Sequence, residues 1–307
     1  MRSDGELIAL IGATGVGKTA LAIQIAQRFN GEIVGADSRQ IYRYMDIGTA
    51  KPTLAERAAA PHHLIDVTEP DQPLTLAEYQ RLAYAAIADI HARGKLPLLV
   101  GGTGQYVTAV LEGWSAPEVP PDPTLRAELE AICAAHGTAA LFEQLRELDP
   151  VSAARIDPHN ARRLIRALEV CILSGKPFSA QRQKVPPPYR VLEIGLYMPR
   201  QALFPRLDAR IERMMQDGLL EEVAWLHERG YDPRLPALSG LGYAQLGAHL
   251  RGECSLEDAV TAFKRETRAF VRRQETWFRH HGAPEWFLAT ESAAVLERIA
   301  AWLHEEK

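Results

Sequence analysis

The chain has 307 residues, of which 47% are hydrophobic and 24% charged, and its formal net charge is −4. This composition is that of an ordinary globular protein large enough to bury its own core. It excludes a protein that is basic over its whole surface, and no apolar run approaches the roughly 20 residues that span a bilayer.

The first residues and the cysteines indicate a cytoplasmic protein without membrane contact. The chain begins with acidic residues and a short apolar run that leads into a glycine-rich loop, which is not the pattern of a signal peptide. Cys133, Cys171 and Cys254 lie far apart and form no CxxC motif. We therefore expect reduced thiols, with neither a disulfide framework nor a metal site.

Short apolar runs alternate with helical patterns in the first third of the chain. The expected strands are residues 6–11, 31–38 and 96–101, and the expected helices are residues 19–29 and 76–95. This alternation predicts a parallel sheet with right-handed crossovers, in which ligands bind at the carboxyl ends of the strands. The punctuated loops at 12–19, 37–40 and 101–106 all follow expected strands, so we expect the site there.

The character of the sequence changes after the proline-rich stretch at 117–125. Residues up to 188 show only short helical patterns and end in a second proline run, whereas residues 190–198 again have the pattern of a strand. Proline-marked segments at both ends indicate an insertion. We predict an α/β fold with a P-loop NTPase-like core, residues 1–116 and 189–307, and an inserted all-helical subdomain, residues 117–188. We expect the remainder after residue 198 to be helical, and the insertion to move when RNA binds.

The loop at residues 12–19 matches the pattern G-x-x-x-x-G-K-[ST] in full. Gly12 and Gly17 let backbone N–H groups turn toward a phosphate, Lys18 adds a positive charge, and the Thr19 hydroxyl is suited to Mg²⁺. The pattern predicts a diphosphate and a metal ion but does not identify the rest of the ligand. No guanine-binding motif follows. The position of Asp37 alone leaves three roles open: a Mg²⁺ ligand, a base that acts on the substrate, or a helix cap.

The segment ADSRQIYRYMDIGTAKPT at residues 36–53 resembles the tRNA dimethylallyltransferase family. The resemblance continues in order through nearly the whole chain, at residues 61–66, 101–106, 160–170, 217–223, 241–246 and 267–279. The visible departures are Phe270 and Val271, where the family more often has Tyr and Ala. These ordered blocks are far more specific than the phosphate loop alone.

The resemblance implies an enzyme that transfers the dimethylallyl group of dimethylallyl diphosphate to the exocyclic amine of the adenine immediately 3′ of the tRNA anticodon. Diphosphate leaves and ATP is not consumed. The resemblance implies catalytic roles for Asp37, Thr103 and Arg210. The expected diphosphate-binding residues are Gly12, Ala13, Thr14, Gly15, Val16, Gly17, Lys18, Thr19 and Arg206, with Mg²⁺ on Thr19.

Three helical segments carry arginines at helical spacing. Arg206, Arg210 and Arg213 share one face next to an apolar stripe, and residues 264–279 hold six cations against Glu266 and Glu275, a local charge of +4. Such basic faces suit RNA phosphates. With the family blocks, they give the expected tRNA-binding residues Asp37, Ser38, Arg39, Gln40, Arg162, Arg163, Arg166, Tyr243, Arg268, Arg272, Arg273 and Gln274. In the helix of Arg162 we expect Asp157 as N-cap and Ile172 on the apolar face.

Other interpretations of the sequence remain open. An adenylate dimethylallyltransferase would share the phosphate-loop half, a P-loop small-molecule kinase would need an ATP pocket, and a nucleotide-dependent switch or RNA-binding module would need no chemistry. The basic helices, the missing guanine motif and Asp37 beside the loop each disfavour one of them. The histidine pairs at 62–63 and 280–281 have no third ligand at metal spacing, so we interpret them as structural. We expect a monomer, although the sequence does not define the oligomeric state, and the roles of Lys51 and Asp66 stay open.

Overall fold

The structure, a computed structural model, describes residues 5–114, 117, 119–120, 122–181 and 184–305. It divides into two compact units, residues 1–111 with 187–307 and residues 112–186. The insertion was expected at 117–188, so the inserted unit starts five residues earlier and ends two earlier. The reason is that the chain leaves the core where a helix ends at Glu112, and Trp114 and Lys184 pair the outgoing and returning segments in an antiparallel bridge.

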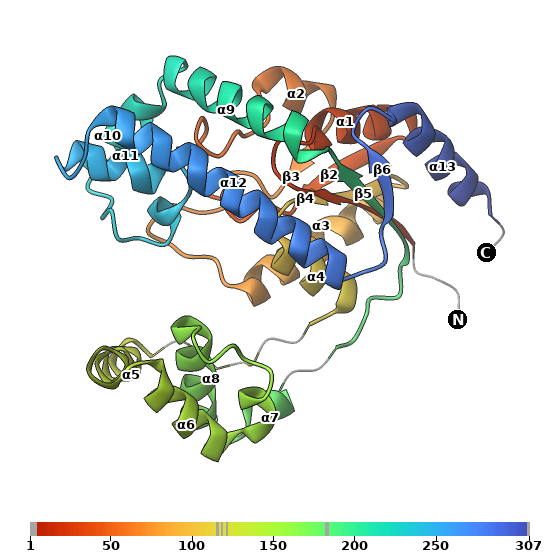
Figure 1. Cartoon of the computed structure of the whole chain (residues 1–307). Coiled ribbons are helices and arrows are strands. Elements are labelled where there is room, and N and C mark those ends of the chain that lie inside the picture. Colours follow the sequence, from red (N-terminus) through yellow and green to blue (C-terminus); the bar gives the residue numbers. More distant parts are fainter. Residues whose placement is uncertain (1–4, 115–116, 118, 121, 182–183, 306–307) are drawn as a thin grey trace. The chain divides into compact units, whose positions relative to one another are not determined.

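The larger unit contains one parallel sheet of six strands in the order β3-β2-β4-β1-β5-β6 (Figure 1). The strands are β1 (Glu6–Gly12), β2 (Gly31–Gly35), β3 (His62–His63), β4 (Leu96–Gly101), β5 (Arg190–Tyr197) and β6 (Glu285–Leu288). The central strand β1 lies between β4 and β5, with Ile8 opposite both Leu98 and Leu192.

Helices cover both faces of this sheet. They are α1 (Lys18–Arg28), α2 (Leu54–Ala59), α3 (Leu76–Ala92), α4 (Gly104–Glu112), α9 (Arg200–Gln216), α10 (Leu219–Glu228), α11 (Tyr243–Leu250), α12 (Leu256–His280) and α13 (Ser292–His304). Alternate residues of β1 enter different cores: Leu7 and Ile11 pack with α3 and α4, whereas Ile8 and Leu10 pack with α1 and α13. A strand buried on both faces explains why this stretch is apolar without interruption.

Two strands of this sheet were not expected from the sequence. β3 has two residues and β6 has four, so the expectation that everything after residue 198 is helical was wrong at β6. Runs this short carry no readable alternation, and pairing with an already formed neighbour decides them. β6 extends the sheet beyond β5 and forms its edge on that side.

The smaller unit is helical and has its own core. Its helices are α5 (Pro123–His136), α6 (Thr138–Leu148), α7 (Pro150–Ala153) and α8 (Ala161–Ser174). Leu141, Leu145, Leu164 and Leu168 are fully buried within it. The N-cap of α8 is Asn160, whose side chain accepts a hydrogen bond from the Arg163 N–H group, so the expected cap at Asp157 was wrong.

Candidate active site

The phosphate loop joins β1 to α1 and requires glycine at fixed places. Gly12 has a φ of 148°, and a Cβ atom there would come within 2.4 Å of the Leu196 carbonyl oxygen. Gly15 has a φ of 83°, and a Cβ atom there would lie 2.5 Å from the Leu207 side chain of α9. The sequence therefore fixes a left-handed loop whose following helix, α1, presents its N-terminus to a bound anion.

Lys18 lies inside this loop, and no carboxylate of the described residues is bonded to it. Its Nζ atom donates hydrogen bonds of 2.9 Å and 2.8 Å to the carbonyl oxygens of Gly12 and Ala13. Burial lowers the pKa of Lys18 to about 8, the Asp37 carboxylate opposes this shift, and the Arg210 guanidinium adds to it. A partly buried ammonium whose bonds from the described residues go to neutral carbonyls is well suited to receive a phosphate.

Asp37 and Thr103 meet at the carboxyl ends of β2 and β4. The Thr103 hydroxyl accepts a hydrogen bond of 2.9 Å from the Ser38 N–H group and lies 3.3 Å from the Ser38 hydroxyl. Asp37 accepts one bond of 2.9 Å, from the Arg39 N–H group, and caps no helix. Among the described residues its second carboxylate oxygen has no hydrogen-bond donor, so Asp37 keeps the capacity to take up a proton.

Two arginines of α9 add positive charge to the same place. Leu203 and Leu207 pack α9 against the loop at Gly15, and an Arg206 nitrogen lies 4.0 Å from the position of a Cβ atom on Gly17. Burial lowers the pKa of Arg210, the Asp37 carboxylate opposes this, and Arg206 and Arg213 reinforce it. The helix thus places Arg206 and Arg210 beside a loop that already concentrates positive potential.

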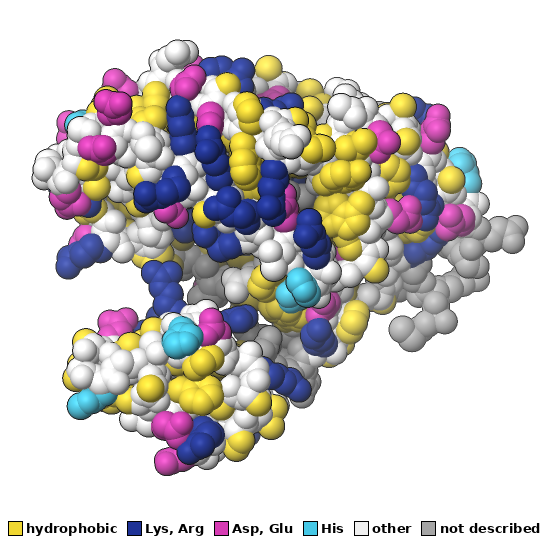
Figure 2. All heavy atoms as spheres, viewed as in Figure 1, with side chains coloured by type: hydrophobic (Ala, Val, Ile, Leu, Met, Phe, Trp, Pro, Cys, Tyr) yellow, Lys and Arg dark blue, Asp and Glu magenta, His cyan; other side chains and the backbone are white. Residues whose placement is uncertain are grey.

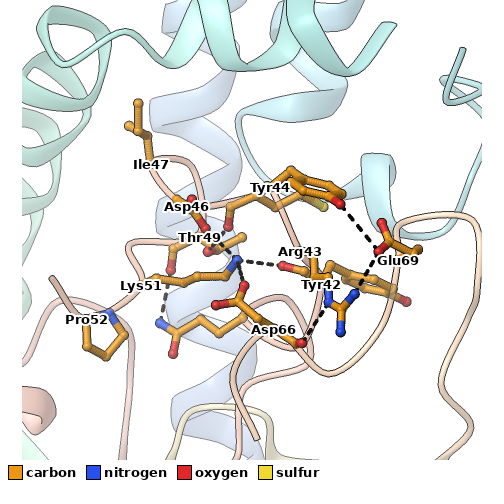
Figure 3. A network of polar contacts seen from close by, with 12 residues as sticks. Tyr42, Arg43, Tyr44, Asp46, Ile47, Thr49, Lys51, Pro52, Asp66 and Glu69 are labelled. Carbon is orange, nitrogen blue, oxygen red and sulfur yellow. Dashed lines mark hydrogen bonds and ion pairs between the residues drawn. The ribbon is translucent and has the colours of Figure 1, made fainter. Parts of the chain in front are cut away.

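A cavity of about 500 Å³ adjoins Arg210 on the side of residues 46–57. Its lining includes Lys51, whose side chain is 2% exposed and whose Nζ atom donates bonds of 2.6 Å each to Asp46, Asp66 and the Tyr42 carbonyl (Figure 3). Burial raises the pKa of Asp66, but the bonds from Lys51 and Arg57 outweigh it and hold that pKa below its ordinary value. Lys51 and Asp66 therefore hold the segment of residues 45–51 in place.

Glu222 of α10 holds the other side of that segment. Its carboxylate accepts bonds from the N–H groups of Asp46, Ile47 and Gly48, and from the Tyr243 hydroxyl at 2.5 Å. Tyr243 is 2% exposed. Tyr243, an expected tRNA contact, is therefore buried in this structure, and its hydroxyl is bonded inside the protein.

The residues around Asp37 also have partners within the protein. The Arg39 guanidinium donates to the carbonyl oxygens of Pro236 and Ala237. The Gln40 amide donates 3.1 Å bonds to the carbonyl oxygens of Thr49 and Ala50. These contacts shape the mouth of the site, and Arg39 and Gln40 remain partly exposed there.

The basic helices combine paired and unpaired arginines. In α8, Arg162 and Arg163 are exposed, while Arg166 and Arg126 both bond the fully buried Glu169. The bonds from these two arginines lower the pKa of Glu169 against the effect of burial. Ile172, expected on the apolar face, is 46% exposed.

In α12, Arg268 is bound to Asp208 of α9. Arg272 and Arg273 are exposed and have no acidic partner in the described part of the chain. Figure 2 shows lysines and arginines gathered over α12 and the neighbouring α9.

Gln274, another expected tRNA contact, is also buried and bonded within the protein. Its side chain is 5% exposed and bonds the phosphate loop at Thr14 and the β4 turn at Gly102. A signal was available in the sequence, because Phe263, Thr267, Val271, Gln274 and Phe278 follow one another at helical spacing and form the buried stripe of α12.

The described residues contain no group of three histidine, cysteine or acidic side chains that could hold a metal ion. His63 bonds Glu32, and His280 Nδ1 donates a hydrogen bond to the Thr276 carbonyl oxygen within its own helix, as expected for structural roles. None of the helices in the described ranges combines the length and hydropathy of a membrane span.

The fold and the site define a parallel α/β transferase with a phosphate loop. The family described as IPP transferase matches residues 40–281. A tRNA dimethylallyltransferase of Roseiflexus sp. (strain RS-1) is 58% identical over 295 residues, 96% of this chain and 96% of the relative. One of Thermomicrobium roseum is 48% identical over 309 residues, covering 100% and 94%. The chain belongs to the IPP transferase family.

Solved structures agree. The tRNA isopentenylpyrophosphate transferase of Bacillus halodurans is 39% identical, with a TM-score of 0.74 over 98% of this chain and 97% of its own. A eukaryotic dimethylallyltransferase described as acting on tRNA is 28% identical, with a TM-score of 0.76 over 94% and 75%. These similarities confirm the family and the α/β fold expected from the sequence.

Proposed function

We propose that this protein transfers a dimethylallyl group from dimethylallyl diphosphate to the exocyclic amine of the adenine immediately 3′ of the anticodon in tRNA, and releases diphosphate. The observation that carries the proposal is the Asp37 carboxylate, with one oxygen free of hydrogen bonds from the described residues, at the strand end beside the Lys18 loop. The relatives at 58% and 48% identity are named for the same reaction.

In this reaction one bond of the allylic carbon is replaced by another. The bond between the allylic carbon and the diphosphate oxygen breaks, and a bond between that carbon and the adenine nitrogen forms. Lys18, the loop N–H groups, Arg210 and Arg206 stabilise the charge on the departing diphosphate. Asp37 accepts the proton that the amine loses, and Thr103 holds the adjacent backbone at Ser38.

Mg²⁺ fits this site as an ion that the protein and the substrate would coordinate together. The protein offers the Thr19 hydroxyl at the first turn of α1, and the described residues hold no acidic cluster that would enclose the ion alone. Mg²⁺ favours such sites, with few protein ligands and several phosphate oxygens. When bound, it would neutralise charge on the diphosphate.

The proposed tRNA contacts are made by exposed or partly exposed groups. Ser38, Arg39 and Gln40 border the adenine beside Asp37, Arg162 and Arg163 of α8 receive phosphates, and so do Arg272 and Arg273 of α12. A stacked base must leave the anticodon loop to reach Asp37, at a cost of a few kcal/mol. We place the enzyme in the cytoplasm, where its tRNA substrate is found.

The test uses purified protein, unmodified tRNA, Mg²⁺ and dimethylallyl diphosphate without ATP, followed by digestion of the tRNA and mass spectrometry of its nucleosides. We expect a dimethylallyl increment on adenosine. In Asp37→Asn the rate should fall about 10²–10⁴-fold, the usual contribution of a positioned base. Asp71→Asn, a change at an exposed carboxylate, serves as the control.

Three outcomes would contradict parts of this proposal. An unchanged rate in Asp37→Asn would remove the base role and keep the reaction. Transfer to free AMP and none to tRNA would indicate an adenylate enzyme. ATP turnover without any prenyl transfer would indicate a kinase-type ligand for the phosphate loop.

A further inference from the structure

The inner face of α12 carries a polar side chain that bridges two loops of the site. Gln274 is 5% exposed, and both ends of its amide are bonded. Its Oε1 atom accepts a hydrogen bond of 2.9 Å from the Thr14 N–H group, and its Nε2 atom donates one of 2.8 Å to the Gly102 carbonyl. The two partners lie 260 and 172 positions away in the sequence, so this single amide joins the end of the chain to the phosphate loop and to the β4 turn.

The bond to Thr14 acts on one particular peptide. The Thr14 N–H group and the Ala13 carbonyl belong to the same trans peptide plane and therefore point in opposite directions. Gln274 binds that plane on one side, and the Lys18 ammonium donates to the Ala13 carbonyl on the other side at 2.8 Å. A rotation of this peptide would remove one of the two carbonyl partners of Lys18, so the amide of Gln274 helps to fix the place of the lysine.

The β4 turn is shaped to receive this amide. A Cβ atom on Gly102 would lie 2.5 Å from the Gln274 Nε2 atom, so any larger residue at 102 displaces the glutamine. Two positions on, a Cβ atom of Gly104 would meet the Trp277 ring at 2.2 Å. The turn and α12 therefore fit closely over the segment that contains Gln274.

We propose that Gln274 is a positioning residue that orients the Ala13–Thr14 peptide, and through it Lys18, for the diphosphate, so that α12 links the RNA surface to the phosphate loop. The link to RNA rests on the proposed function. Arg272 and Arg273 are exposed on the same helix, two residues and one residue before the buried amide. RNA held by these arginines fixes α12, and the bridge carries that constraint to the loop.

Only an amide satisfies both partners. A methionine of similar length would leave the Thr14 N–H group and the Gly102 carbonyl without partners. A glutamate would still accept from Thr14 but could not donate to Gly102 unless protonated. An unpaired buried peptide group weakens the arrangement that depends on it, and about tenfold in affinity is the expected size.

The experiment measures binding of inorganic diphosphate with Mg²⁺ by calorimetry, with and without an anticodon stem-loop RNA, and steady-state prenyl transfer alongside. In Gln274→Met we expect the dissociation constant for diphosphate to rise about tenfold. The KM for dimethylallyl diphosphate should rise equally, with kcat within about threefold of the parent. RNA affinity without diphosphate should stay within twofold, and any effect of RNA on diphosphate affinity should disappear.

The control is Gln24→Met, the same change at an exposed position of α1, which should alter none of these values. If Gln274→Met does not fold, Gln274→Glu and Gly102→Ala test the same bridge, because the first keeps the Thr14 bond and the second displaces the amide. Both should weaken diphosphate binding, Gly102→Ala by more.

Two results separate this inference from the proposed function. Parental diphosphate affinity in Gln274→Met, with only a lower melting temperature, would overturn the positioning role and leave the reaction intact. Weaker diphosphate binding in a protein that transfers nothing to tRNA would retain the positioning role and overturn the reaction.

Discussion

Two lysines at the carboxyl edge of the same sheet have opposite surroundings. Lys51 is buried, and its ammonium bonds the carboxylates of Asp46 and Asp66 (Figure 3). Within the described part of the chain Lys18 donates only to two carbonyl oxygens, and burial lowers its pKa to about 8. The charge of Lys51 is neutralised within the protein, whereas the ammonium of Lys18 has no bonded anion among the described residues and can receive one from a ligand. The phosphate loop and the segment of residues 45–51 thus differ in whether the lysine charge is already paired within the protein.

The contrast between Lys18 and Lys51 separates cations that bind a ligand from cations that support the fold of this protein. A buried cation that is paired with carboxylates of the protein contributes to the free energy of folding, and its removal lowers stability. A cation bonded to neutral groups in a tight loop is held in a costly state that a bound anion relieves. Arg210, near Asp37 and crowded by Arg206 and Arg213, resembles Lys18 in this respect.

The largest expected effect comes from removing the unpaired charge. Lys18→Met should lower kcat/KM for prenyl transfer about 10²–10³-fold, the usual loss for one donor to a developing anion. The melting temperature should change little or rise, because a desolvated ammonium is removed. Steady-state kinetics and a thermal melt on the same preparation check both. A large loss of stability would mean that Lys18 supports the fold as Lys51 does and would break the comparison.

Removing the paired charge should act on stability instead. Lys51→Met leaves two carboxylates without their partner and should lower the free energy of unfolding by about 2–3 kcal/mol. This lies near the lower end for a broken buried pair, because Asp66 is one-third exposed and Asp46 more so. Urea denaturation measures it, and a matched Lys95→Met change at a more exposed lysine should cost less. Activity per folded molecule should fall far less than in Lys18→Met, and an equal fall would assign Lys51 to the substrate.

The sequence predicted the part of this site that depends on backbone conformation and strand ends. The phosphate loop, the strand-end positions of Asp37 and Thr103, and the arginine face of α9 all lie where spacing and alternation placed them. Glycine patterns and helical periodicity act over a few residues, so they can be read without the fold. The arrangement of Asp37 beside Lys18 follows from parallel strands ending at one edge.

The sequence could not predict which polar groups are already paired. Tyr243 and Gln274 stand in motifs typical of the family, but a matching motif does not say whether a side chain faces inward. The partners of Lys51, Glu222 and Gln274 lie up to 260 positions away and become visible only in three dimensions. β3 and β6 were missed for the same reason, because their neighbours in the sheet define them.

The pH dependence of diphosphate binding tests whether the unpaired charge of Lys18 contributes to affinity. Well below its pKa of about 8 Lys18 is protonated, so its contribution to affinity is constant there. Above pH 8 the free protein loses that proton and binding must restore it, so affinity for dimethylallyl diphosphate should fall toward tenfold per pH unit until the raised pKa of the complex is reached. Calorimetry at constant Mg²⁺ from pH 7 to 9.5 measures this. Lys18→Arg, which stays charged, should show no such fall, and an equal fall in both would point to another group.

The smallest expected effect extends the comparison to the surface of α12. Arg268 is paired with Asp208, whereas Arg272 and Arg273 lack acidic partners in the described part of the chain. The double change Arg272→Ala with Arg273→Ala should weaken tRNA binding by roughly three- to tenfold at physiological salt. It should also reduce the slope of log K against log salt by about 2, one for each phosphate that an arginine no longer neutralises. Fluorescence anisotropy with labelled tRNA between 50 and 300 mM salt, about the range where this effect is large, gives both quantities.

Arg268→Ala should instead lower the melting temperature and leave the slope nearly unchanged, since the Arg268 charge is already paired with Asp208. A salt slope that fell more for Arg268 than for the pair would show that RNA competes with Asp208 for this arginine, and pairing within the protein would then no longer separate structural cations from binding ones.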